Sequence, residues 1–194
     1  MFSPGNESSE TAERTASFVH RLTVARAEEA AAAAKTSAIL AEAYAFTVEQ
    51  TERLRSASAR EREMPLRAMA AELAVASRMN DRTMQTHLYD AHRLVNDFPD
   101  SWNALHEGRI SRAHTSVIVD TGRELDERAA RGAFENDVLA YAETTSPARV
   151  RSYAEQVAEN LNPKSMQERH DRAVLDQRIW VDDLRDGMSM LGVI

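Results

Sequence analysis

The sequence has no cysteine, few glycines and prolines, and no long apolar run. The absence of cysteine in 194 residues excludes disulfides, thiolate zinc sites and cysteine nucleophiles, and it favours a reducing compartment. Six glycines and five prolines argue against a turn-rich β fold. No stretch approaches the roughly 18 apolar residues that a membrane span needs, and the first residues do not resemble a secretion signal. We therefore expect a helical, cytoplasmic protein without a membrane segment.

The charge balance limits the kinds of partner. The formal net charge is -7, which argues against a surface that coats nucleic acid or anionic lipid along its whole length. Any contact with nucleic acid must therefore come from a local basic patch. The hydrophobic content of 43% is enough for one substantial core in a chain of this length.

Apolar residues recur at helical spacing along most of the chain. The segment 9–56 contains no proline or glycine and predicts one long helix or two nearly collinear helices. Its middle, Ala30 to Ala34, has little bulk and would permit another helix to approach closely. Two interpretations remain open, an ordinary packed helix and a coiled coil that joins two copies of the chain.

Two shorter helices are predicted to follow, separated by a tight turn. Pro65 suits the first turn of a helix that ends near Arg78. Asn80 or Asp81 can cap the next helix, which would stop near Phe98-Pro99. The inner face of that helix would consist of Met84, Leu88, Ala91 and Val95.

The second half of the chain predicts several further helices. Gly108 would end a local helix, and Ser111 would cap the next, with Ala113, Val117 and Ile118 buried. Helices over 126–143 and from Ser146 onward should pack antiparallel, because only a short link joins them. Their buried residues are predicted to be Phe134, Tyr141, Val150, Tyr153 and Val157.

The C-terminal segment predicts a β-hairpin. Apolar, β-prone residues over about 178–184 and 188–193 flank an Asp186-Gly187 turn. Because the sequence stops inside the second strand, we expect the natural polypeptide to continue. The predicted fold is mainly α, a multi-helix bundle with a long N-terminal helix, a helix-turn-helix-like segment and a small C-terminal β-hairpin. We divide it into a long helical segment (1–56), a helical body (57–178) and the hairpin (179–194), which would begin a following region.

An ordered set of short motifs resembles a known family. The motifs are Phe98-Pro99, Gly108 to Ser111, Ser146-Pro147 and Asp186 to Met188, and they span most of the chain. In this order they resemble the domain-of-unknown-function family 222. The resemblance implies a non-catalytic N-terminal region of actinobacterial HNH-endonuclease-like proteins, whose relatives commonly carry a C-terminal HNH nuclease module.

No catalytic motif is recognisable in these residues. An HNH site needs a histidine and metal ligands in a compact frame, but none of the six histidines stands at i, i+4 from another. Phosphate-binding loops, nucleophile elbows and Ser-x-x-Lys motifs are also lacking. We therefore predict no catalytic residue, no metal site and no cofactor in this segment.

The most informative segment lies between Ala71 and Leu94, which has the spacing of a helix-turn-helix. It is similar to the DNA-binding region of ParB-type partition proteins. The stretch from Arg53 to Arg82 holds seven arginines against four acids, which inverts the overall charge. The residues predicted to contact double-stranded DNA are Arg78, Arg82, Thr83, Gln85, Thr86 and Tyr89.

Two functional hypotheses follow from these patterns. In the first, the domain positions DNA through this segment for a nuclease module. In the second, the chain is a helical scaffold or a dimerisation module that touches no nucleic acid, and its arginines lie on a solvated face paired with nearby acids.

Overall fold

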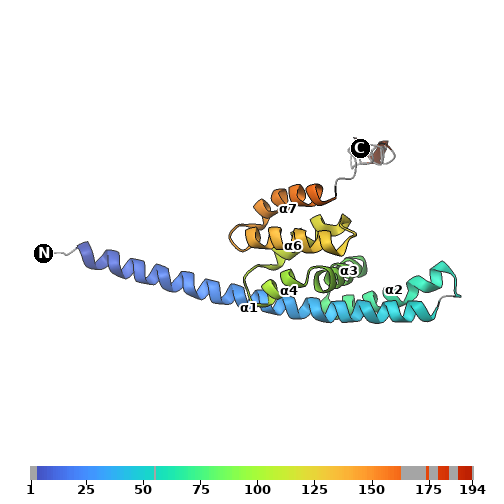
Figure 1. Cartoon of the computed structure of the whole chain (residues 1–194), viewed down its shortest axis with the longest axis horizontal. Helices are drawn as coiled ribbons and strands as arrows, with labels where there is room; N and C mark the ends of the chain where they lie inside the picture. The colour runs from blue at the N-terminus through green and yellow to red at the C-terminus, as the bar shows by residue number, and fades with distance from the viewer. Residues whose placement is uncertain (1–3, 55, 163–173, 175–178, 184–187, 194) are drawn as a thin grey trace.

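The protein forms a layered helical body with one very long helix along its side. A computed structural model describes residues 4–54, 56–162, 174, 179–183 and 188–193. Figure 1 shows α1 along one side, α2 beside its C-terminal half, and α3, α4, α6 and α7 stacked above it. The elements are α1 (Pro4–Arg53), α2 (Ala59–Ser77), α3 (Asp81–Asp97), α4 (Pro99–His106), α5 (Arg112–Thr121), the 3₁₀ helix η1 (Gly122–Glu124), α6 (Arg128–Ala142), α7 (Pro147–Leu161), β1 (Ile179–Asp183) and β2 (Ser189–Val193).

Helix α1 is a single helix with two different halves. Of the two forms expected from the sequence, the structure shows one continuous helix. Its N-terminal half extends beyond the other helices, and Leu22 there is 62% exposed (Figure 1). From Ala30 onward the helix contributes buried alanines to the core. The division at residue 56 remains a prediction, although the second half of α1 packs within the body.

The small residues of α1 allow close contact with the segment around α4. Gly108 has a φ of 75°, in the left-handed region, and its backbone lies against Ala27. A Cβ placed on Gly108 would lie only 2.7 Å from the Ala27 Cβ. Nearby, the Trp102 indole N–H donates to the Ala34 carbonyl at 3.1 Å. These contacts join the two segments tightly.

Two apolar clusters form the described core. The larger one joins α1 to α3–α7 and centres on Phe98 and Phe134, whose rings meet edge-on with centroids 6.0 Å apart. The smaller one joins α1, α2 and α3, with Met84 and Leu88 packed on Ala70 and Ala74. The second cluster holds the predicted helix-turn-helix segment against α1.

Two buried charged residues connect distant parts of the chain. The Glu135 carboxylate, 3% exposed, accepts the Ser101 backbone N–H at 2.7 Å and so satisfies the start of α4. Arg93 pairs with Asp97 at 3.0 Å and donates to the Arg123 carbonyl at 2.8 Å. Burial raises the pKa of Glu135 above its ordinary value.

The start predicted for the second helix was wrong. Helix α2 begins at Ala59, so Pro65 lies inside the helix and not in its first turn. The reason is a capping box: the Ser58 side chain accepts the Glu61 N–H, and the Glu61 carboxylate accepts the Ser58 N–H. Two orphan donors are thus satisfied before the proline is reached.

Three of the predicted buried positions were wrong. Tyr141 and Tyr153 are exposed to 38% and 37%, although Phe134, Val150 and Val157 are buried as predicted. The two rings pack against each other, with centroids 4.8 Å apart. Ala113 is also exposed, while Val117 and Ile118 are buried.

The predicted fold class needs correction at its C-terminal end. Across residues 4–54 and 56–162 the structure contains no strand, and both described clusters draw only on residues between 30 and 161. The bundle is therefore all-helical, and a β-hairpin is no part of its described core. Strands β1 and β2 pair with each other in antiparallel register, from Ile179 opposite Val193 to Asp183 opposite Ser189. The predicted Asp-Gly turn lies outside the described residues, and an isolated two-stranded ribbon has little apolar surface to bury.

Candidate nucleic-acid interface

A three-residue turn joins α2 to α3. Arg78 adopts a left-handed conformation at the end of α2, with φ 53°, and its N–H bonds to the Ala74 and Val75 carbonyls. Asn80 caps α3, because its side-chain oxygen accepts the Arg82 N–H at 2.8 Å. The predicted cap and the predicted end of α2 are thus confirmed. Figure 1 shows α2 running along α1 and α3 viewed nearly along its axis, so the two helices cross steeply.

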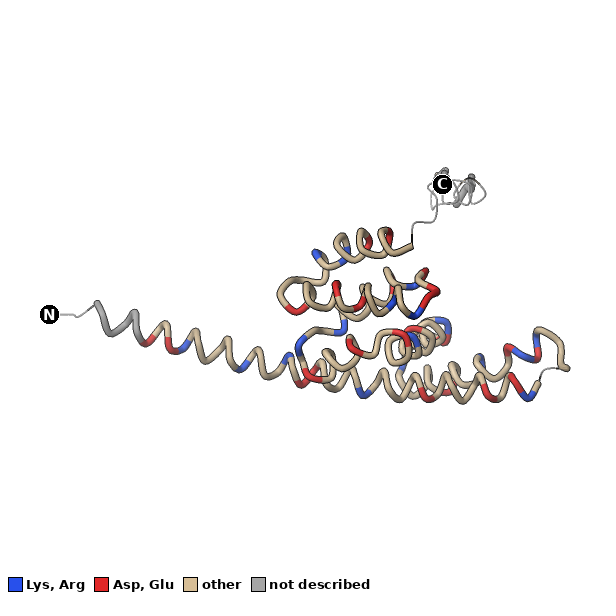
Figure 2. The backbone as a smooth tube through the Cα atoms, in the orientation of Figure 1, with Lys and Arg blue, Asp and Glu red and all other residues tan. Residues whose placement is uncertain are grey.

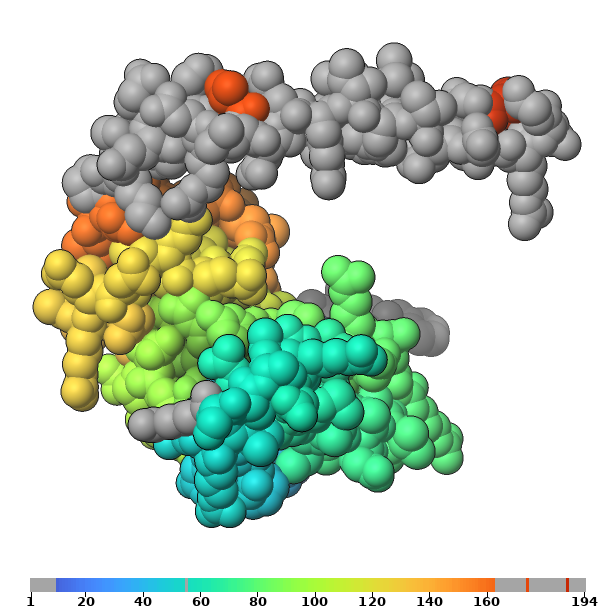
Figure 3. Space-filling model, turned by 90° about the vertical axis from the view of Figure 1, so that its right-hand side faces the viewer, coloured from blue at the N-terminus to red at the C-terminus, as the bar shows by residue number. Residues whose placement is uncertain are grey.

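Burial of one face of α3 leaves the opposite face of its first turns exposed. Met84, Leu88 and Ala91 are buried at 2%, 0% and 6% exposure, as their i, i+4, i+7 spacing predicted. Figure 3 shows α2 and the start of α3 on the surface at this end of the molecule. Gln85 is half-buried and lines a groove beside Tyr44 and Arg62. The other five predicted contact residues are exposed: Arg78, Arg82, Thr83, Thr86 and Tyr89.

These side chains differ in how free they are to meet a ligand. Tyr89 packs its ring edge-on against Tyr44 of α1, with centroids 6.2 Å apart. The Thr86 hydroxyl donates to the Arg82 carbonyl at 3.3 Å. Within the described part of the chain, neither the Arg78 nor the Arg82 guanidinium forms an ion pair. Arg78 and Arg82 are therefore the side chains that can turn fully toward an anionic partner.

The arginine-rich stretch is partly neutralised. Arg67 pairs with Glu63 at 2.7 Å across one turn of α2. Figure 2 shows acidic positions interspersed with the basic ones along the described backbone. Arg55 lies outside the described residues. The candidate interface is consequently small and centres on the turn and the first residues of α3.

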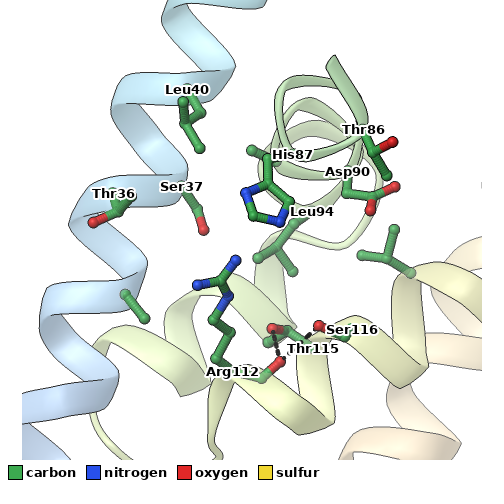
Figure 4. A pocket seen from close by; sticks show the side chains of 13 residues that line it. Thr36, Ser37, Leu40, Thr86, His87, Asp90, Leu94, Arg112, Thr115 and Ser116 are labelled. Carbon is green, nitrogen blue, oxygen red and sulfur yellow. Dashed lines mark hydrogen bonds between the residues drawn. The ribbon is translucent and has the colours of Figure 1, made fainter. Parts of the chain in front are cut away.

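A polar pocket between α1, α3 and α5 lies beside this face, and the sequence did not indicate it. Arg112 of α5 directs its guanidinium toward His87 of α3 and Ser37 of α1 (Figure 4). Burial lowers the pKa of His87, the Arg112 charge lowers it further, and Asp90 opposes both effects. The pKa of Asp90 is itself raised, mainly by burial. Thr86 lines both this pocket and the exposed face of α3.

The residues that the structure describes show neither a metal cluster nor a membrane-spanning helix. Among them, no group of three histidine, aspartate or glutamate side chains gathers closely enough to hold a metal ion. No helix in that part of the chain is long and apolar enough to cross a membrane.

The fold and the site define a helical bundle in which a three-residue turn joins α2 to α3. Comparison with protein families then identifies it: the chain belongs to the family described as "Domain of unknown function (DUF222)", whose model matches residues 11–193. The family resemblance read from the sequence motifs is thereby confirmed. Neither the curated proteins nor the solved structures yielded a match to the chain.

Proposed function

We propose that this domain positions double-stranded DNA through the first turns of α3, on behalf of an HNH-type nuclease module such as the family resemblance implies. The observation that supports the proposal is the arrangement around the α2–α3 turn. Apolar contacts hold one face of α3 in the body, while Arg78, Arg82 and Thr83 remain exposed where the helix begins.

The physical chemistry of helix-turn-helix binding suits this arrangement. In such motifs the N-terminal residues of the second helix reach base edges, while neighbouring groups hold phosphates. The N-terminus of α3 carries a partial positive charge from its backbone N–H groups, and Arg78 and Arg82 add two full charges beside it. Because the whole segment is acidic, we expect weak affinity, in the range of about 10⁻⁴–10⁻⁶ M that is typical of non-specific binding.

The test is duplex binding by fluorescence anisotropy over a series of salt concentrations that begins low. Arg82→Ala should weaken binding and lower the salt dependence by about one phosphate contact. Stability should change by less than about 0.5 kcal/mol, because the Arg82 side chain makes no core contact. The matched control is Arg149→Ala, which removes the same charge from an exposed position on α7, on the opposite layer of the body (Figure 1).

Equal binding by Arg82→Ala and Arg149→Ala would place the contact elsewhere on the molecule. No binding at low salt, by this segment or by the natural polypeptide, would favour the second candidate, a helical scaffold that dimerises through α1. One observation supports that alternative: the extended half of α1 exposes Phe18, Val19 and Leu22, each at about 60%.

We also propose that the protein works in the cytoplasm of an actinobacterium. The lack of cysteine suits a reducing cytoplasm, and the motif resemblance suggests an actinobacterial source.

A further inference from the structure

The pocket between α1, α3 and α5 has the size of a small ligand. Its volume is about 240 Å³, several times the share of about 30 Å³ that a water molecule occupies in the liquid. Sites for drug-sized molecules begin at about 300 Å³. The pocket therefore suits a small polyatomic group and not a whole nucleotide.

Three hydrogen-bond donors converge in this pocket from three helices. They are the Ser37 hydroxyl, the His87 imidazole and the Arg112 guanidinium (Figure 4). Among the described residues, none of these three side chains has a hydrogen-bond partner or an ion pair. The remaining hydroxyls of the lining donate to backbone carbonyls of their own helices: Thr36, Thr86, Thr115 and Ser116.

The charges around the pocket favour an anion beside Arg112. Helix α1 contributes no charged residue to the lining, α5 contributes Arg112, and α3 contributes His87 and Asp90. The single carboxylate, Asp90, faces Arg123 with 3.5 Å between its oxygen and the guanidinium nitrogen. Arg112 and His87 face one space, where burial first and the Arg112 charge second lower the pKa of His87 and favour the neutral imidazole, while Asp90 acts in the opposite direction.

We propose that this pocket binds a phosphate-type oxyanion, held by Ser37, His87 and Arg112. A tetrahedral oxyanion accepts hydrogen bonds in several directions and would satisfy all three donors at once. The anion can come from two sources, a free phosphate or phosphate monoester, or a backbone phosphate of DNA lying along α3. Only the second source rests on the proposed function, because Thr86 connects the pocket to the exposed face of α3.

The experiment follows the His87 imidazole by NMR during pH titration, in sodium phosphate and in sodium chloride of equal ionic strength. His87→Gln identifies the resonance, and His20, exposed on the extended part of α1, is the internal control. Bound phosphate should raise the pKa of His87 relative to chloride, because the anion stabilises the imidazolium, and the His20 signal should show no response to phosphate. Arg112→Gln should abolish this difference and weaken phosphate binding at least about tenfold, whereas Arg149→Gln should not. A melting temperature of Arg112→Gln equal to that of the wild type would show that the variant folds normally.

Equal pKa values of His87 in phosphate and chloride would overturn the proposal, and so would a phosphate response that survives Arg112→Gln. A short duplex added in chloride then distinguishes the sources. A His87 shift at duplex concentrations far below those needed for inorganic phosphate identifies the DNA backbone, whereas a shift with phosphate alone identifies a free phosphate ligand. The Arg82→Ala variant tests DNA binding through α3 separately, so the failure of that proposal can be told apart from the failure of the pocket proposal.

Discussion

Replacing Gly108 by alanine should destabilise the protein strongly, because two independent costs meet at this position. The left-handed backbone, with φ 75°, costs an L-residue about 1–2 kcal/mol. The new methyl group would lie 2.7 Å from the Ala27 Cβ and 2.8 Å from the Ala27 Cα, and overpacking of this kind costs about 1–3 kcal/mol. Alanine also restricts the unfolded chain more than glycine does, and this effect offsets about 0.4–1 kcal/mol of the loss. We therefore expect a net loss of about 1–4.6 kcal/mol.

Gly132 provides a control with the same chemical change and the opposite expected sign. It lies in α6, is exposed, and a Cβ placed there would have no heavy atom within 4 Å apart from those of its chain neighbours and the adjacent helix backbone. Gly132→Ala should stabilise the protein by about 0.5–1 kcal/mol, because alanine favours a helix interior over glycine. The pair of variants therefore separates the effect of the Gly108 site from the general effect of removing a glycine.

The assay is urea unfolding followed by circular dichroism, with thermal melting alongside. For a chain of this size about 1 kcal/mol corresponds to 2–4 °C, so Gly108→Ala should lower the melting temperature by at least about 2 °C. A double variant, Ala27→Gly with Gly108→Ala, should recover little of the loss, because the Cα of residue 27 would still lie 2.8 Å from the new methyl group and glycine weakens the interior of α1. If Gly108→Ala proved neutral or stabilising, the contact between α1 and the α4–α5 turn would be wrong.

Two further predictions concern a buried carboxylate and the extended helix. Because the folded-state pKa of Glu135 is raised above its ordinary value of 4.5, its contribution to stability is present at low pH and is lost as the pH rises through the raised pKa. Glu135→Gln keeps an acceptor for the Ser101 N–H. In urea unfolding, the free energy of unfolding of this variant should therefore rise relative to that of the wild type as the pH increases. Parallel pH profiles of the two proteins would refute this. If α1 dimerises the chain, sedimentation equilibrium should show dimers that Leu22→Glu dissociates and that His20→Glu, on the opposite side of α1, leaves intact. Monomers in all three samples would remove the coiled-coil alternative.

Local features of the fold were predictable from neighbouring residues. Asn80 and Ser111 cap helices as predicted, because a cap depends on contacts within a few positions. The burial of Met84, Leu88 and Ala91 followed from apolar spacing alone, whereas Val95, predicted on the same face of α3, is only half-buried. The start of α2 was missed although its signal, Ser58 followed by Glu61, was present in the sequence.

Features that join distant residues were not predictable. Periodicity places Tyr141 and Tyr153 on the inner faces of their helices, but coverage by other elements decides burial, and both remain more than a third exposed. The bond from the Ser101 N–H to Glu135 likewise depends on how α4 meets α6. The exposed face of α3 could be predicted from the sequence of that one helix. The pocket could not, because its residues come from three helices.

The sequence by itself determined that the chain is helical, where most helices cap and end, and which family it belongs to, because these depend on local preferences and short motifs. Only the tertiary structure decided that the compact core is made by helices alone and that α1 has an extended half and a packed half. It also brought Ser37, His87 and Arg112 into one pocket (Figure 4). Each of these three residues stands on a different helix, and their convergence follows from how the helices pack, which no local pattern encodes.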